Sequence, residues 1–134
     1  MEYIEGLRLK EKLNDLLSYE RKTICIALGR LIGRLHQKRI IHGDLTKSNI
    51  IIDKNGKIFL VDFGLAEYSG ELEKRGVDLL LAKRALHSTH YNYAQQCFNA
   101  IIEGYSIEMG AKATQKVIER IKIIEKRGRY TVER

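Results

Sequence analysis

The chain contains no proline and no tryptophan, and it has only two cysteines among its 134 residues. Without proline there is no proline-rich linker, and no low-complexity stretch interrupts the sequence, so one continuously folded domain is the expectation at this length. Cys25 and Cys97 both fall on the apolar face of a predicted helix, where a buried free thiol behaves as a small hydrophobic group. This cysteine usage is typical of a protein of the reducing cytoplasm.

The sequence also lacks a long apolar segment. Its apolar runs, such as residues 50–52 and 79–82, are far shorter than the roughly 20 residues that a membrane-spanning helix needs. Residues 1–6 show no basic segment followed by an apolar stretch, so they do not resemble a secretory signal. We therefore expect a cytoplasmic protein that does not enter a membrane.

Negative charge is scarce relative to positive charge. Lys and Arg number 24 against 17 Asp and Glu, and the formal net charge is +7. Residues 112–134 hold eight Lys or Arg against three Glu, so the excess lies mainly at the C-terminal end. Such an excess favours a polyanionic partner such as nucleic acid, but helices are also basic for solubility alone, and charge does not distinguish the two.

Helical periodicity is present along most of the chain. Apolar residues recur at helical spacing in five segments. Gly29 and Gly33 lie four residues apart in the second of these, which predicts close packing of that helix against another element. The five predicted helices span residues 7–17, 19–35, 76–84, 94–105 and 111–126.

Two short runs rich in β-branched residues, 50–53 and 58–61, are separated by a turn that contains Asn55 and Gly56. An Asn-Gly pair between such runs predicts a β-hairpin with a type I′ turn, because both residues tolerate a positive φ angle. The two strands follow one another directly and are antiparallel, so the pattern excludes a βαβ repeat. The predicted fold class is α+β and mainly helical, with one small hairpin.

Two polar motifs flank this hairpin. Residues 42–49 read His-Gly-Asp-Leu-Thr-Lys-Ser-Asn, and Asp62, Phe63 and Gly64 follow the second strand. An aspartate, an asparagine five residues later and a separate Asp-Phe-Gly after a hairpin resemble the catalytic loop and the magnesium loop of the protein kinase superfamily. The resemblance implies the C-terminal lobe of a kinase-like fold.

The roles implied by this resemblance agree with the demands of phosphoryl transfer, which needs an oriented nucleophile and metal ions beside the phosphate charge. Asp44 would orient a hydroxyl group or a water molecule. Asn49 and Asp62 would hold Mg²⁺ of bound ATP, since Mg²⁺ completes its coordination with water and phosphate oxygens. Alternatively, Asp44 and Asn49 cap turns and Asp62 ends a strand, which accounts for each residue but not for their joint arrangement.

The same resemblance implies that the first residues form the hinge, the segment that joins the two kinase lobes and binds adenine through its backbone. Glu2 and Ile4 would supply those backbone groups, unless the segment is only a frayed terminus. We therefore expect a hinge in residues 1–6 and a C-terminal lobe, with a basic tail, in residues 7–134. No glycine-rich phosphate loop and no strand-borne lysine can be placed, so the N-terminal lobe is expected in a longer polypeptide or in another chain. This lobe alone is expected to bind ATP weakly.

Within the superfamily, the chain resembles the atypical kinase of the KEOPS complex, which supports threonylcarbamoyladenosine formation on transfer RNA. The resemblance implies an ATP-dependent serine/threonine kinase or ATPase that works with the threonylcarbamoyl transferase subunit and other KEOPS subunits. It also implies tRNA backbone contacts from the basic C-terminus, for which an ordinary solvated helix end is the alternative. The residues implied in tRNA contact are Lys126, Arg127, Arg129 and Arg134. The matching stretches are residues 42–46, 48–49, 61–65, 75–79, 88–90 and 127–129.

The chain also departs from ordinary kinases. Gly43 stands where most kinases carry an arginine that pairs with a phosphorylated loop, so activation by that route is not expected. An Ala-Pro-Glu motif cannot exist without proline, so a wide range of peptide substrates is not expected either. By resemblance, His42 fixes its loop and Asp78 braces that loop from the following helix, although an acid near a helix start also explains Asp78. Two other interpretations stay open, a RIO-like or aminoglycoside-type phosphotransferase and a non-catalytic lobe that docks partners or RNA.

Overall fold

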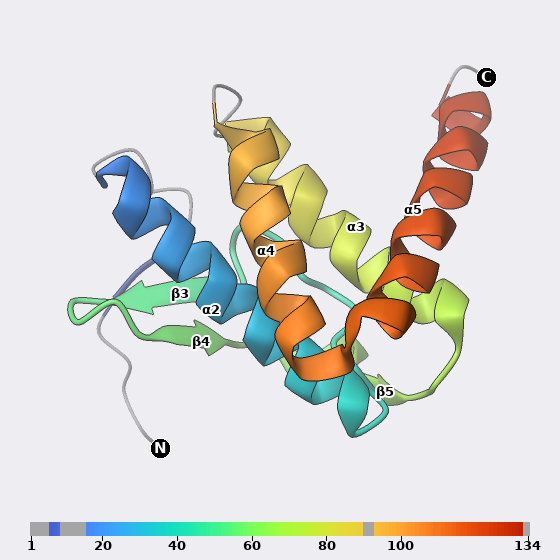
Figure 1. The fold of residues 1–134 in the computed structure, drawn as a ribbon, viewed down its shortest axis with the longest axis horizontal. Helices are drawn as coiled ribbons and strands as arrows, with labels where there is room; N and C mark the ends of the chain where they lie inside the picture. Colours follow the sequence, from blue (N-terminus) through green and yellow to red (C-terminus); the bar gives the residue numbers. More distant parts are fainter. Residues whose placement is uncertain (1–5, 9–15, 90–92, 133–134) are drawn as a thin grey trace.

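The computed structural model describes residues 6–8, 16–89 and 93–132. In this part of the chain, long helices pack together, with a small antiparallel sheet containing β3 and β4 at the left of Figure 1 and another containing β5 at the lower right. The predicted α+β, mainly helical fold is thereby confirmed. The helices are α2 (Ser18–Gln37), α3 (Leu72–Thr89), α4 (Ala94–Met109) and α5 (Ala111–Val132). The strands are β1 (Gly6–Arg8), β2 (Ile40–Ile41), β3 (Ile50–Asp53), β4 (Ile58–Leu60) and β5 (Glu67–Tyr68), and η2 (Phe63–Leu65) is a short 3-10 helix.

Helices α2 and α4 make the tightest contact of the fold. A Cβ atom built on Gly29 would lie 1.9 Å from the carbonyl oxygen of Ile101, and one built on Gly104 would lie 2.0 Å from a backbone oxygen of α2. One turn further along, Gly33 faces the backbone of Tyr105, so the two helices run in the same direction. The close packing predicted for Gly29 and Gly33 is therefore confirmed, and glycine is required because any side chain would separate the two backbones.

The hydrophobic core lies between these helices, α3 and the hairpin, and α5 closes it from the opposite side. Both cysteines belong to this core, and both are free thiols as predicted. Its fully buried large side chains are Tyr105, Leu28, Ile32, Leu45, Ile50, Ile52, Leu79, Leu86, Ile101 and His36. None of the helices described is long and apolar enough to span a membrane.

Helix α5 packs against α3 and α4 through one apolar face, as its periodicity predicts. Val117 and Ile121 are buried on that face. Two arginines of α5, Arg120 and Arg127, form ion pairs with Glu73 at the start of α3. These ion pairs hold α5 against the N-terminal end of α3.

The predicted hairpin is present as β3 and β4, but its turn differs from the prediction. The amide of Gly56 donates to the carbonyl of Asp53 at 3.0 Å, and φ is positive at Gly56 (82°) but not at Asn55. This is a type I turn followed by a left-handed glycine, the usual three-residue hairpin loop, and not a type I′ turn. The carboxylate of Asp53 accepts hydrogen bonds from the amides of Asn55 and Lys57, and these bonds favour the longer loop.

Two element boundaries also differ from the prediction. Residues 7 and 8 were expected to begin a helix, but they belong to β1, which pairs with β3 in the sheet order β1-β3-β4. The hydrogen bonds of this ladder override a short helical pattern of only moderate propensity. Helix α3 begins at Leu72 rather than at residue 76, because Leu72 packs against the core and extends the apolar face by one turn.

Candidate active site

The loop of residues 42–49 is anchored from below by Asp78 of α3. The Asp78 side chain is fully buried, and its carboxylate accepts hydrogen bonds from the backbone amides of His42 and Gly43, both at 2.9 Å. A buried carboxylate is stable only when its oxygens are hydrogen-bonded. The two bonds therefore tie the beginning of the loop to the most buried part of α3.

A third hydrogen bond to Asp78 comes from His36, in the last turn of α2. The distance from His36 Nε2 to Asp78 Oδ2 is 2.9 Å, and Nδ1 of the same ring lies 2.7 Å from the hydroxyl of Tyr105 on α4. Burial raises the pKa of the Tyr105 hydroxyl, which stays protonated. A carboxylate only accepts hydrogen bonds, so Nε2 of His36 carries a proton and donates to Asp78. Three helices thus meet in one buried polar chain beneath the loop.

His42 connects the loop to the chain segment that follows β4. Its Nε2 lies 2.9 Å from the carbonyl oxygen of Val61, and its Nδ1 accepts a hydrogen bond from the amide of Asp44 at 3.1 Å. The imidazole ring also packs against the ring of Phe63, with 4.5 Å between centroids. His42 therefore holds Asp44 and the residues on both sides of position 62 in one place.

Gly43 allows the same two segments to touch. Its φ angle is 87°, and a Cβ atom built on it would lie 2.5 Å from the carbonyl oxygen of Leu65. A larger residue would therefore clash with the backbone that follows the Asp-Phe-Gly motif. The glycine noted as a departure from ordinary kinases is thus required by local packing.

Asp44 and Asn49 are in direct contact. The amide nitrogen of Asn49 donates to the carbonyl oxygen of Asp44 at 2.9 Å and to its carboxylate Oδ2 at 3.1 Å. Both bonds use the Nδ2 end of the Asn49 side chain, so Oδ1 of that amide and Oδ1 of Asp44 stay available to a ligand. Asn49 is almost fully buried, and Asp44, near the beginning of the loop, is half-buried.

Asp62 directly follows Val61, whose backbone is hydrogen-bonded to that of Asn49. The amide of Val61 donates to the carbonyl of Asn49 at 3.0 Å, and the chain then turns through Asp62 with φ 60° and ψ 69°. A left-handed conformation is uncommon for a residue with a side chain and costs roughly 1 kcal/mol or more. The Asp62 carboxylate is exposed and accepts one long hydrogen bond, 3.4 Å, from the amide of Gly64. The carboxylate is therefore accessible, and it belongs to the residue that directly follows the one bonded to Asn49.

Comparison with known proteins agrees with this geometry. A family model described as protein kinase domain matches residues 1–98. The chain belongs to the protein kinase domain family. The matched residues include both polar motifs and the bracing aspartate of α3.

Similar proteins carry names that refer to the KEOPS complex or to tRNA threonylcarbamoyladenosine biosynthesis. A protein of Pyrococcus abyssi named KEOPS complex subunit Bud32 is 48% identical over 130 residues, which cover 97% of this chain and 59% of that protein. A protein of Methanothermobacter thermautotrophicus named probable bifunctional tRNA threonylcarbamoyladenosine biosynthesis protein is 44% identical over 131 residues, 98% of this chain and 22% of that protein. The EKC/KEOPS complex subunit BUD32 of Debaryomyces hansenii is 38% identical over 122 residues, 87% of this chain and 46% of that protein. The chain therefore spans at most about three fifths of these relatives.

The kinase-family site has the chemistry of a magnesium site that phosphate would complete. Mg²⁺ prefers oxygen ligands and keeps several water or phosphate oxygens in its shell, so one carboxylate and one amide oxygen are a sufficient protein contribution. Asp62 offers the carboxylate, and Asn49 offers an amide oxygen whose orientation is set by the two bonds of its nitrogen. Among the described residues, no group of three or more His, Cys, Asp and Glu side chains is placed to hold a metal ion. The residues present fit Mg²⁺ brought by a nucleotide.

Several residues named from the sequence lie apart from this site or beyond the described part of the chain. Glu2, Ile4 and Arg134 lie outside the described residues, as does the side chain of Arg129. Lys126 is exposed on α5, whereas Arg127 pairs with Glu73. Of residues 1–6, only Gly6 is described, and it begins β1.

Sequence reasoning missed the contribution of two residues beneath the site. Neither His36 nor Tyr105 was named as a site residue from the sequence, but together they complete the hydrogen bonding of Asp78. One signal for His36 was available. It falls on the buried side of α2 at helical spacing from Gly29 and Gly33, where a polar side chain needs a partner.

Proposed function

We propose that this chain is the C-terminal lobe of a kinase-like phosphotransferase or ATPase that supports threonylcarbamoyladenosine formation on tRNA. The proposal rests on the hydrogen bonds from the Asn49 side chain to Asp44. Asn49 also accepts a backbone hydrogen bond from Val61, the residue before the exposed Asp62. The names of the relatives, KEOPS complex subunit Bud32 and tRNA threonylcarbamoyladenosine biosynthesis protein, support the biological role.

In the proposed mechanism, Mg-ATP supplies the phosphoryl group and the metal charge that stabilises its transfer. Asn49 and Asp62 would hold Mg²⁺ through the amide oxygen and the carboxylate, respectively. Asp44 accepts a hydrogen bond from a water molecule or a serine or threonine hydroxyl and orients it for attack. The bond from Asn49 keeps one Asp44 oxygen engaged, so the other is directed to the nucleophile.

The same proposal includes partners and location. The threonylcarbamoyl transferase subunit and other KEOPS subunits are the expected protein partners, and the expected compartment is the cytoplasm. Glu2 and Ile4 are the proposed adenine-binding positions. The basic C-terminal end of α5, with Lys126 and Arg127 and the residues that follow, is the proposed tRNA contact. Support for the tRNA contact is the excess of Lys and Arg in residues 112–134.

The proposed chemistry is tested by Asp62→Asn in the full-length protein. A neutral amide in place of the metal-binding carboxylate removes charge stabilisation from the transition state, so magnesium-dependent ATP turnover should fall by about two orders of magnitude or more. The matched control is Asp53→Asn, because Asp53 is a carboxylate of the same hairpin whose turn bonds an asparagine can also accept. ATP turnover should be measured for both variants at saturating Mg²⁺, with and without the transferase subunit.

Equal turnover in the wild type and the Asp62→Asn variant would refute the assignment of the metal site and favour a non-catalytic docking lobe. A loss of the same size in Asp53→Asn would show that disruption of the hairpin, rather than of metal binding, lowers turnover.

The proposed tRNA contact is tested on α5 with two double variants. Lys126→Gln with Arg127→Gln removes two charges from the proposed contact, so the slope of log K against log salt should decrease by roughly 1.4 to 1.8. Lys112→Gln with Lys116→Gln removes the same charge from the other end of the same helix and should leave the slope nearly unchanged. Filter binding of tRNA over a salt series measures both, and equal slopes for the two double variants would favour an ordinary solvated helix end.

A further inference from the structure

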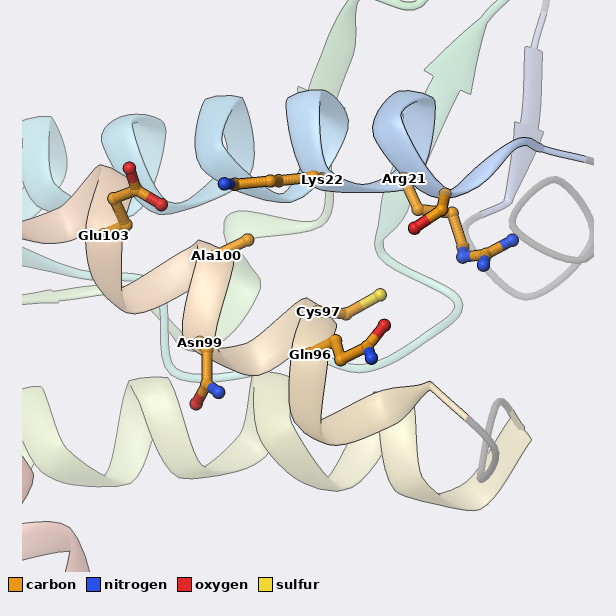
Figure 2. Close-up of a pocket in the computed structure, with 8 residues that line it drawn as sticks. Arg21, Lys22, Gln96, Cys97, Asn99, Ala100 and Glu103 are labelled. Atoms are coloured by element: carbon orange, nitrogen blue, oxygen red, sulfur yellow. The ribbon is translucent and has the colours of Figure 1, made fainter.

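A cavity lies between the N-terminal halves of α2 and α4, away from the candidate active site. Its volume is about 400 Å³, and its lining includes Arg21 and Lys22 of α2 and Gln96 and Asn99 of α4. Cys97 also lines the cavity, and Figure 2 shows its side chain pointing from α4 toward α2. The cavity gives small polar molecules a route to Cys97, whose exposed fraction is 3%.

A second thiol lies directly behind the first. Cys25 of α2 is completely buried, and its thiol and that of Cys97 shift each other's pKa. Both cysteines lie one helical turn before the backbone contact of Gly29 with Ile101. The sulfur atoms therefore face each other across the helix interface.

The two helices are unusually close one turn beyond the cysteines. Two packed helices usually keep their axes about 8–10 Å apart, whereas a disulfide needs Cα atoms about 4.4–6.8 Å apart. Gly29 and Gly104 remove the side chains that normally separate two helices, and the backbones of α2 and α4 touch. One turn from such a contact, two cysteines on parallel helices can be joined without a large shift of either helix.

The two thiols differ in their readiness to react. The hydrogen bond from Cys25 lowers the pKa of Cys97 against the opposing effect of burial, and the nearby Arg21 guanidinium lowers it further. The same hydrogen bond and burial raise the pKa of Cys25. Because the thiolate is the nucleophile, Cys97 is the thiol that reacts first with an oxidant.

We propose that Cys97 is an oxidation site for hydrogen peroxide and that Cys25 resolves the oxidised thiol, giving a disulfide that joins α2 to α4. In the first step the Cys97 sulfur attacks one peroxide oxygen, an S–O bond forms, the O–O bond breaks and water leaves, so that Cys97 becomes a sulfenic acid. In the second step the Cys25 sulfur attacks the Cys97 sulfur, the S–S bond forms and the S–O bond breaks. The hydroxide that leaves takes the Cys25 proton and departs as a second water. Overall the two thiols lose two electrons and one peroxide is reduced to two water molecules.

The cross-link would act on the helices that support the candidate active site. α2 carries His36 and α4 carries Tyr105, and these two residues complete the hydrogen bonds of Asp78. A covalent bond between the N-terminal halves of α2 and α4 leaves the hydrogen bonds among Tyr105, His36 and Asp78 intact and opposes separation of the two helices.

The test is made on the full-length protein, treated with hydrogen peroxide under native conditions and then alkylated with N-ethylmaleimide in denaturant. In the wild type we expect loss of alkylation at both cysteines, a mass lower by two hydrogen atoms and a cross-linked peptide that contains Cys25 and Cys97. The change should be reversed by dithiothreitol. Continued alkylation of both thiols after peroxide treatment would overturn the proposal, and this measurement requires no variant.

Two variants assign the order of the steps. In Cys25→Ser, Cys97 has no resolving thiol and should become labelled by dimedone, a reagent for sulfenic acid. In Cys97→Ser, the fully buried Cys25 should remain unlabelled under the same conditions. Labelling of Cys25 in the second variant, or no labelling of Cys97 in the first with its far-UV circular dichroism unchanged, would refute the assignment of Cys97 as the first thiol to react.

Discussion

Replacement of Asp78 by asparagine should destabilise the folded chain by about 3 kcal/mol, because the variant leaves a buried backbone amide without an acceptor. Oδ1 of Asp78 accepts from the amide of Gly43, and Oδ2 accepts from the amide of His42 and from Nε2 of His36. An asparagine side chain has one oxygen and one NH₂ group, so one of these two sites becomes a donor that faces a donor.

The magnitude follows from the two possible orientations of that amide. If NH₂ faces Gly43, one buried N–H is unsatisfied. If it faces His42 and His36, the histidine can change tautomer and accept, but the amide of His42 still loses its acceptor. Either way one buried N–H group loses its acceptor, which costs roughly 1–3 kcal/mol. The remaining hydrogen bonds no longer involve a carboxylate charge, which weakens each by about 1 kcal/mol.

Urea unfolding followed by far-UV circular dichroism measures this loss as a lower midpoint with an unchanged slope. Asp53→Asn is a suitable control, because Asp53 is a partly exposed turn residue whose role asparagine can take over, and its effect should stay within about 0.5 kcal/mol. Tyr105→Phe removes a single neutral hydrogen bond to His36 and should cost about 1–2 kcal/mol. A loss below about 1 kcal/mol in Asp78→Asn would refute the argument that this carboxylate anchors the loop.

Two further predictions concern the packing and the charges of the helices. Gly29→Ala should lower the free energy of unfolding by about 2 kcal/mol or more despite a gain in helix propensity of about 1 kcal/mol, since the added methyl group would lie 1.9 Å from the Ile101 carbonyl oxygen. The same measurement on Gly33→Ala should show a smaller loss, because that methyl group would first meet a side-chain atom at 2.9 Å, and equal losses would contradict the argument. Hydrogen bonds from Arg127, and then from a second arginine, lower the pKa of Glu73, so its ionised form stabilises the fold above the unfolded pKa of about 4.3 and this contribution disappears as the pH falls through the folded pKa. Glu73→Gln should therefore lower the urea midpoint at neutral pH and have no effect in strong acid, and a difference independent of pH would argue against this ion pair.

Most of the elements could be predicted because their signals are local. The apolar spacing in residues 94–105 and 111–126 predicts the helices α4 and α5, and the β-branched runs around Asn55 and Gly56 predict a hairpin. The predictions that were wrong depend on competing interactions. The type of the turn was decided by hydrogen bonds to Asp53, and residues 6–8 became a strand because β3 offered a free edge.

The candidate site was predictable in part for the same reason. The spacing from Asp44 to Asn49 and the Asp-Phe-Gly motif are visible in the sequence, as is their position on either side of a hairpin. The contact between Asp44 and Asn49 requires a loop that folds back on itself, and this depends on the support of Asp78 from a distant helix.

The sequence by itself determined helices α2 to α5, where the hairpin lies and which polar residues follow its strands, because periodicity and turn chemistry act over a few neighbouring residues. Only the tertiary structure decided that His36, Asp78 and Tyr105 share one buried chain of hydrogen bonds, and that the thiols of Cys25 and Cys97 face each other. These contacts join residues far apart in the chain. They depend on which helices pack together and at what depth, which in this fold was set by the glycines that bring α2 and α4 into contact.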